Sequence, residues 1–260
     1  MFNFFNKRFC VNKYNLFSLF RLSFSLFSVL LLFSSISYSQ TLTADEYFSR
    51  GLAKGNSGDN RGAIEDFTKA IEINPKNAMA YYNRGLAKML LGDNKGAIQD
   101  YTKAIELNPK DEYIYYLYCY QGVAKANLGD YIGAIQDYNK AIYINSKNKF
   151  AFLNRALAKN QLEDSRGSIQ DFSNAIEIDP RDANLYYNRG IVRSKLKDYL
   201  GAIEDYSIAI NLDPKDAKFY KIRGIEKYLI GDKEGACLDF SKAGELGLDE
   251  AYNLIKEYCQ

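Results

Sequence analysis

Residues 78–111 read AMAYYNRGLAKMLLGDNKGAIQDYTKAIELNPKD, and residues 183–216 give the related segment ANLYYNRGIVRSKLKDYLGAIEDYSIAINLDPKD. In both segments, two stretches of helical length carry apolar residues at helical spacing and are separated by a short turn, such as Leu91-Gly92-Asp93. The second stretch ends at an Asn-Pro or Asp-Pro pair, which stops a helix. The pattern predicts a hairpin of two helices. Because neither helix can bury its apolar face alone, neighbouring hairpins must stack.

The same period of 34 residues runs through most of the chain, with one step of 37. Two series of small residues mark it, and all four Pro residues close a repeat. The first series is Gly51, Gly85, Gly122, Ala156, Gly190 and Gly224, the second is Gly62, Gly96, Gly133, Gly167, Gly201 and Gly235, and the prolines are Pro75, Pro109, Pro180 and Pro214. A fixed period of this length is typical of architectures that stack one helical hairpin on the next.

The residues of each repeat resemble the tetratricopeptide repeat (TPR) family, whose pattern is a large aromatic residue, Gly, Ala, a second aromatic residue, Ala and Pro. In the second repeat this pattern is matched by Tyr81, Gly85, Ala97, Tyr101, Ala104 and Pro109. The resemblance covers residues 44–250. It implies an all-α fold, a right-handed superhelical TPR solenoid of antiparallel helix pairs, in which the first helix of each pair lines the concave side.

Six repeats and a short terminal helix are predicted. The boundaries are 44–77, 78–111, 112–148 with a three-residue insertion, 149–182, 183–216 and 217–250, followed by a capping helix at 251–260. In the last segment Ala251, Leu254, Ile255 and Tyr258 fall on one helical face, and Asp249 is the expected N-cap. Such a helix shields the apolar end of a stack.

The first forty residues differ in composition from the rest. They carry four basic residues and no acidic residue, followed by an apolar run of fifteen residues at 22–36 that is short for a bilayer span. Ser37 and Ser39 then supply small residues where a signal peptidase cleaves. We interpret residues 1–39 as a signal peptide and the chain as exported, periplasmic or secreted. An uncleaved membrane anchor and an organelle transit peptide are the alternatives.

Composition argues against nucleic-acid binding and against catalysis. Without the four basic residues of the leader, 34 − 4 = 30 Lys and Arg stand against 32 Asp and Glu, a net charge of 30 − 32 = −2. The chain contains no His, the usual general base and the commonest transition-metal ligand, and no phosphate-binding glycine motif. We therefore expect no catalytic residue, no cofactor and no metal site. The expected partner is a protein or peptide of unknown identity, without membrane insertion once the signal is cleaved.

One departure from the family pattern recurs along the chain. Where the family usually carries Leu before the small residue of the first helix, five repeats carry Arg and the third carries Gln121. An Asp stands sixteen residues after each Arg, giving the pairs Arg50–Asp66, Arg84–Asp100, Arg155–Asp171, Arg189–Asp205 and Arg223–Asp239. Because an unpaired charge at a half-buried interface costs several kcal/mol, we predict an ion pair within each of these five hairpins. An Arg ladder that binds anions is the alternative.

The resemblance also implies where a partner binds. Carried over position by position, the concave side is apolar in the second repeat and becomes mixed and cationic toward the C-terminus. The predicted contacts are Met79, Tyr82, Leu86, Met89, Phe150, Leu153, Asn160, Tyr187, Lys195, Lys218, Lys221 and Tyr228. Family members that clamp a terminal carboxylate use Asn where this chain has Leu52, Leu86 and Val123, which argues against such a clamp. The alternative function is a structural spacer or assembly adaptor in an envelope complex, using its edges or convex face.

The insertion in the third repeat precedes a Tyr-rich stretch. Residues 113–120 read YIYYLYCY, and Asp111 is expected to cap a first helix that is extended at its start. A neighbouring helix cannot cover every face of such a segment. We predict that Tyr113 and Tyr116 form a partner-contact patch, and local packing of the extra turn is the alternative.

Three Cys follow the predicted signal peptide, too few for a disulfide scaffold. Cys237 replaces an Ile that the other repeats carry, and it is predicted to be a small buried hydrophobic residue. Export would allow a bridge between Cys237 and Cys259, which is the alternative.

Overall fold

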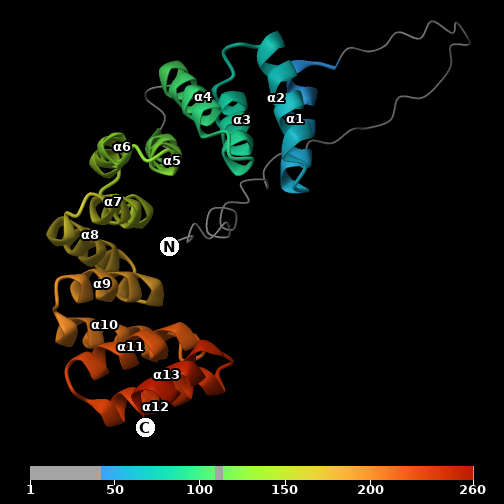
Figure 1. Ribbon diagram of the computed structural model, residues 1–260. Helices are drawn as coiled ribbons and strands as arrows, with labels where there is room; N and C mark the ends of the chain where they lie inside the picture. The colour runs from blue at the N-terminus through green and yellow to red at the C-terminus, as the bar shows by residue number, and fades with distance from the viewer. Residues whose placement is uncertain (1–41, 109–113, 260) are drawn as a thin grey trace, which may run out of the picture. The chain divides into compact units, whose positions relative to one another are not determined.

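The computed structural model describes residues 42–108 and 114–259, and these residues form thirteen α-helices and no strand. Successive helices pair into hairpins (Figure 1). Their bounds are α1 (Ala44–Asn56), α2 (Asn60–Ile73), α3 (Ala78–Leu90), α4 (Asn94–Leu107), α5 (Ile114–Asn127), α6 (Tyr131–Ile144), α7 (Lys149–Gln161), α8 (Ser165–Ile178), α9 (Ala183–Lys195), α10 (Tyr199–Leu212), α11 (Ala217–Leu229), α12 (Lys233–Glu245) and α13 (Glu250–Tyr258). The predicted all-α solenoid of helix pairs is confirmed.

Each hairpin turn ends in an Asp that caps the second helix, and in four of the six turns a Gly precedes this Asp. The Asp93 side chain caps α4 by accepting a hydrogen bond from the Gly96 N–H at 2.9 Å. The equivalent bond caps the second helix of each of the other five hairpins. A Cβ atom on Gly96 would collide with the Asp93 carboxylate, which explains the second glycine series. Gly92 supplies a φ of +87°, a conformation that L side chains rarely adopt.

The first glycine series lets the two helices of a hairpin come close together. A Cβ atom on Gly85 of α3 would lie 2.9 Å from the Tyr101 ring of α4. That ring is fully buried between Ala97 and Ala104. The equivalent buried rings of the other second helices are Phe67, Tyr138, Phe172, Tyr206 and Phe240. Each hairpin thus buries one aromatic ring of its second helix against the small residue of its first helix.

Helices that follow one another in the sequence pack against one another throughout the described residues. Neighbouring first helices also touch, α1 with α3, α3 with α5 and α5 with α7. No contact of that extent joins neighbouring second helices in the part of the chain that the structure describes. The first four hairpins therefore converge on the side of their first helices, where the family resemblance implies that a partner binds.

The terminal helix α13 covers the end of the last hairpin. Ala251 is buried, whereas Leu254, Ile255 and Tyr258 are half-buried, in agreement with the predicted inner face. Asp249 occupies the N-cap position but makes no side-chain capping bond. A side-chain cap needs an extended backbone, and Asp249 is already helical with φ −56° and ψ −35°, so the prediction of a capping Asp249 is wrong in this respect.

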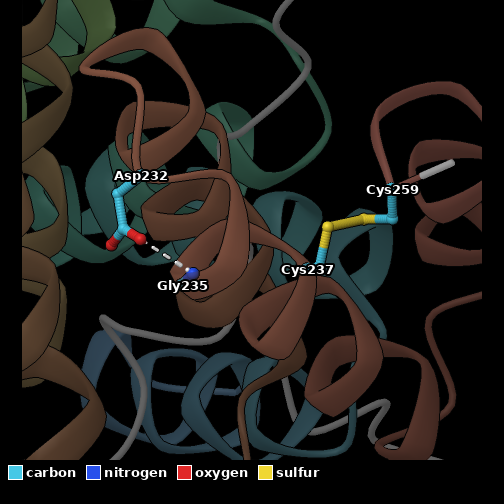
Figure 2. The surroundings of a disulfide bond; sticks show 4 residues. All are labelled: Asp232, Gly235, Cys237 and Cys259. Carbon is cyan, nitrogen blue, oxygen red and sulfur yellow. Dashed lines mark hydrogen bonds between the residues drawn. A yellow bond between two sulfur atoms is a disulfide. The ribbon is translucent and has the colours of Figure 1, made fainter.

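A disulfide joins Cys237 of α12 to Cys259, which follows α13 directly, with the two Cα atoms 5.8 Å apart (Figure 2). Cys237 is half-buried and covalently bound, so the prediction of a free, buried hydrophobic residue is wrong and the alternative is correct. The physical reason is that α13 packs on α12 and brings Cys259 beside position 237. The remaining described cysteine, Cys119, is buried and reduced.

Several predictions fall wholly or partly outside the described residues. The signal peptide, the expected cap Asp111 and the side chain of Tyr113 belong to the ranges 1–41 and 109–113. The described part of α5 has 14 residues, against 13 in the other first helices, because it begins one position earlier in the repeat. In the described ranges, no helix is long and apolar enough to cross a membrane.

Candidate partner-binding surface

The recurrent Arg lies between the two helices of its hairpin and is held by the Asp of the second helix. Arg189 Nε and Nη2 donate to the two carboxylate oxygens of Asp205 at 3.0 and 2.7 Å. The same two-point geometry joins Arg50–Asp66, Arg84–Asp100, Arg155–Asp171 and Arg223–Asp239. The predicted ion pairs are confirmed. Because these guanidinium groups are engaged by buried carboxylates, the structure favours ion pairs that hold the fold over an anion-binding ladder.

A second cation completes each of the five ion pairs, and four of the five Arg residues also bond to the preceding repeat. The sequence reasoning missed both contacts. A second cation, four residues after the Arg, reaches the same carboxylate, as Arg193 Nη1 does at 3.1 Å from Asp205 Oδ2. The recurrent Arg itself also donates to the preceding repeat, as Arg189 Nη1 does to Ser173 Oγ at 3.0 Å. The sequence contains a signal for each contact. Every repeat has a Lys or Arg four residues after the recurrent Arg, or after Gln121 in the third repeat, and a Thr, Ser or Asn two residues after its Asp.

The first hairpin has the Arg–Asp pair but no preceding second helix for its Arg to bond to among the described residues. Arg50 is 48% exposed, whereas its four equivalents are 14–18% exposed, and its Nη1 has no partner among the described residues. An open cleft of about 500 Å³ lies beside it, lined by Tyr47, Ile64 and Lys69 among others. In later hairpins the corresponding Nη1 donates to the preceding second helix.

The third hairpin departs from this scheme. Gln121 Nε2 donates to Thr102 Oγ1 at 2.6 Å and so keeps the inter-repeat bond. Asp137, 1% exposed, has no Arg partner and is left with two lysines: Lys125 Nζ lies 2.6 Å from its Oδ2, and Lys140 Nζ lies 3.8 Å from its Oδ1. Burial raises the pKa of the Asp137 carboxyl, whereas the hydrogen bonds from Arg50 lower the pKa of Asp66. The third hairpin therefore has the least complete charge pairing in the series of Arg–Asp pairs, which we call the Arg–Asp ladder.

All the predicted contact residues that the structure describes lie on first helices. Those of the second repeat approach a row of aromatic rings, in which Tyr82 lies 5.8 Å from Tyr120, and Tyr120 lies 6.2 Å from Phe150. Met89 packs against the same cluster. Met79 is 53% exposed. A partner can therefore reach Met79, whereas Tyr82, Met89 and Phe150 also hold neighbouring hairpins together.

The middle of the surface is half-buried. Leu86, Leu153 and Tyr187 each keep part of their side chain accessible. Leu153 and Tyr187 pack against the core of repeats four to six, where the Tyr187 ring lies 5.2 Å from that of Phe219. These residues combine a packing role with a partly exposed edge.

Toward the C-terminus the surface carries cations. Lys195 and Lys218 are exposed, and Lys195 Nζ lies 3.5 Å from the Asn160 Oδ1 atom. Lys221 Nζ donates to Glu250 Oε2 at 2.9 Å, which ties α11 to the start of α13. These three ammonium groups lie on α9 and α11, and the Glu250 carboxylate offsets the charge of Lys221.

Tyr228 lines an apolar cleft of about 190 Å³ between α11, α12 and α13. Its ring lies 4.5 Å from that of Tyr258. The remaining lining residues are Ile225, Leu229, Phe240 and Leu254. The cleft has the size of an apolar side chain.

The Tyr-rich stretch is only partly described. Tyr116 is half-buried, with its ring 4.2 Å from that of Tyr115, and Tyr118 and Tyr120 are half-buried as well. The patch of Tyr113 and Tyr116 stays a prediction, as do the other partner contacts. In residues 42–108 and 114–259, no three His, Cys, Asp or Glu side chains form a group that could hold a metal ion.

Family models match four stretches of the chain. Models described as tetratricopeptide repeat match residues 78–111, 115–148 and 172–204, and one described as TPR repeat matches residues 44–92. No curated relative matches the chain in sequence.

Solved structures share the fold. MamA superposes with a TM-score of 0.60 at 23% identity, over 67% of this chain and 94% of MamA. PilF of Pseudomonas aeruginosa gives 0.67 at 17% identity, over 82% and 96%. YrrB, described as a TPR protein with an unusual peptide-binding site, gives 0.55 at 20% identity, over 66% and 87%. At these identities the likeness shows the fold alone.

Proposed function

We propose that this chain, which belongs to the tetratricopeptide repeat family, is a non-enzymatic scaffold that holds a protein or peptide segment against the side formed by its first helices. The observation that carries the proposal is the chemistry of that side. The first helices of the first four hairpins converge there. Along the array, the first helices keep Met79 and Leu229 more than half exposed and Lys195 and Lys218 exposed. Exposed apolar side chains beside fixed polar groups are typical of recognition surfaces. The peptide-binding site described for YrrB supports the same use of the fold.

The order of residue types along the surface suggests the partner's chemistry. The apolar and aromatic side chains of repeats two to four fit apolar side chains, and the cations of repeats five and six fit carboxylates. The Arg–Asp ladder keeps the hairpins in register, so the surface is largely formed before the partner arrives. Without any His in the chain, we propose no catalytic role for the surface.

We further propose that the scaffold works outside the cytoplasm, as a periplasmic or secreted protein, with membrane anchoring by an uncleaved signal as the alternative. The leader-like composition of residues 1–39 and the Cys237–Cys259 bridge support this, because disulfides persist in oxidising compartments. N-terminal sequencing of the protein from its native fraction tests it. A chain that begins at Gln40 supports export with cleavage, and an intact Met1 contradicts cleavage.

An assembly adaptor that uses its edge is the second candidate function. One observation at the first hairpin favours this function. Arg50 Nη1 has no hydrogen-bond partner among the described residues, and an open cleft lies beside this side chain. Charge reversal at Lys69, which lines this cleft, should then abolish capture of the partner.

A matched pair of variants tests the main proposal. Lys195→Glu with Lys218→Glu reverses two charges on first helices, and Lys95→Glu with Lys233→Glu makes the same change on the second helices α4 and α12, where both Lys are exposed. In affinity capture from the native envelope fraction, we expect the first pair to lose the partners of the wild type and the second pair to keep them. Equal capture by both pairs, or loss in the second alone, would contradict binding at the first helices. Melting curves check that both variants are folded.

A further inference from the structure

Position 226 breaks the pattern of the buried residues. The equivalent positions in the other five repeats hold small apolar residues, Ala53, Ala87, Ala124, Ala158 and Val192. Glu226 is nevertheless only 2% exposed. It lies in the middle of α11, which packs on α10. A carboxyl group has therefore been placed inside the joint between repeats five and six.

The surroundings of Glu226 satisfy only part of this carboxyl. Ser194 Oγ, from α9, donates to Oε1 at 2.7 Å. Oε2 has no hydrogen-bond partner among the described residues, and neither has the fully buried Tyr206 hydroxyl of α10. Buried polar oxygens without partners are costly, and an ionised one is more so.

The charged groups of the neighbouring helices are engaged elsewhere. Arg189 and Arg193 of α9 hold Asp205 of α10. On α11 and α12, Arg223 and Lys227 hold Asp239. No ion pair joins Glu226 to a cation in the described ranges. The ionised form thus has one hydroxyl donor and no counter-charge.

We propose that Glu226 makes the joint between repeats five and six sensitive to pH, tightening the packing of α11 on α9 and α10 when the carboxyl is protonated and loosening it when the carboxyl ionises. Protonation removes the charge from a buried carboxyl whose Oε2 has no hydrogen-bond partner among the described residues. Because α11 also carries Lys221 and Tyr228, the shape of the C-terminal part of the partner-binding surface follows the same equilibrium.

The direction of the effect follows from linkage. Burial raises the pKa of Glu226 in the folded chain, and burial together with the Glu226 charge raises the pKa of Tyr206. A carboxyl whose pKa is higher when folded binds more protons in the folded state between its two pKa values. The stability of the joint therefore falls as pH rises through that window, by at most about tenfold per pH unit in the opening equilibrium, and stays low above it.

Amide hydrogen exchange of the full, oxidised chain tests this proposal. Protection of the α11 amides, corrected for the intrinsic exchange rate, is measured between about pH 5 and 8 for the wild type, Glu226→Gln and Glu226→Ala. Glu234→Gln, a change at an exposed Glu of α12, is the matched control. The expected result is that protection in the wild type and the control falls with pH relative to both Glu226 variants.

The outcome that overturns the proposal is a constant ratio of wild-type to Glu226→Gln protection across the whole range. A constant ratio would mean that Glu226 does not titrate there, whatever the size of its packing contribution. Glu226→Ala restores the residue type of the other repeats, so it provides the same comparison should Glu226→Gln fail to fold.

Discussion

Replacing Arg189 by Ala removes the most completely enclosed ion pair of the ladder. The change deletes two donor contacts to Asp205, which is fully buried, and the Nη1 bond that ties repeat five to Ser173 of repeat four. It also removes the guanidinium that lies 5.7 Å from the Tyr186 ring centre. The buried carboxylate is then left with Arg193 alone.

The magnitude follows from what remains. Breaking one side of a buried ion pair costs about 3–5 kcal/mol when the other charge is left uncompensated. Because Arg193 Nη1 stays 3.1 Å from the carboxylate, we expect the lower end, about 3 kcal/mol. Arg50→Ala should cost clearly less, because that side chain is 48% exposed and has no bond to a preceding repeat in the described residues.

Urea unfolding followed by circular dichroism, with the disulfide intact, measures both variants. Because repeat arrays need not unfold in one step, hydrogen exchange in α9 and α10 should accompany the global curves. If Arg50→Ala destabilises the chain as much as Arg189→Ala, burial and the inter-repeat bond do not determine the contribution of the ladder, and the reasoning fails.

Four further variants test other parts of the fold. Gln121→Arg should give Asp137 a two-point partner, lower the raised pKa of this carboxyl and stabilise the chain at neutral pH by about 1 kcal/mol, and an unchanged carboxyl titration by NMR would contradict this. Glu163→Gly and Lys197→Gly should each stabilise by roughly 0.5–1 kcal/mol, because these residues hold φ at 64° and 63°; lower melting temperatures would refute it. Cys259→Ser opens a bridge across 22 residues and should cost about 3 kcal/mol, with the loss of exchange protection greatest in α13.

The architecture could be predicted from the sequence because each repeat contains the residues that set its helix ends, its turn and its helix packing. Gly85 and Tyr101 determine how closely two helices pack, and Gly92 and Asp93 determine where the chain turns. These are local constraints that recur, so each repeat supports the reading of the others. The Arg–Asp pairs were predictable for the same reason, since a spacing of sixteen residues spans one hairpin.

Features that depend on how separate elements meet were harder to predict. The bond from Arg189 to Ser173 needs the relative register of two hairpins, which no single repeat contains. The bridge from Cys237 to Cys259 needs the path of the chain after Gly247, where φ is +89°. Among the predicted contact residues, Met79 and Tyr82 are equivalent in sequence, yet Met79 is exposed and Tyr82 packs on neighbouring rings.

Site-specific photo-crosslinking shows whether a partner binds at the first helices of the array. A photoreactive amino acid replaces Met79 or Lys218, both exposed on first helices, or Gln99 or Gln136, both exposed on second helices. After irradiation in the native envelope fraction, mass spectrometry identifies the crosslinked peptides. We expect a common partner to be crosslinked from positions 79 and 218 and not from 99 or 136. Crosslinks to that partner from the second helices alone would contradict a binding surface formed by the first helices.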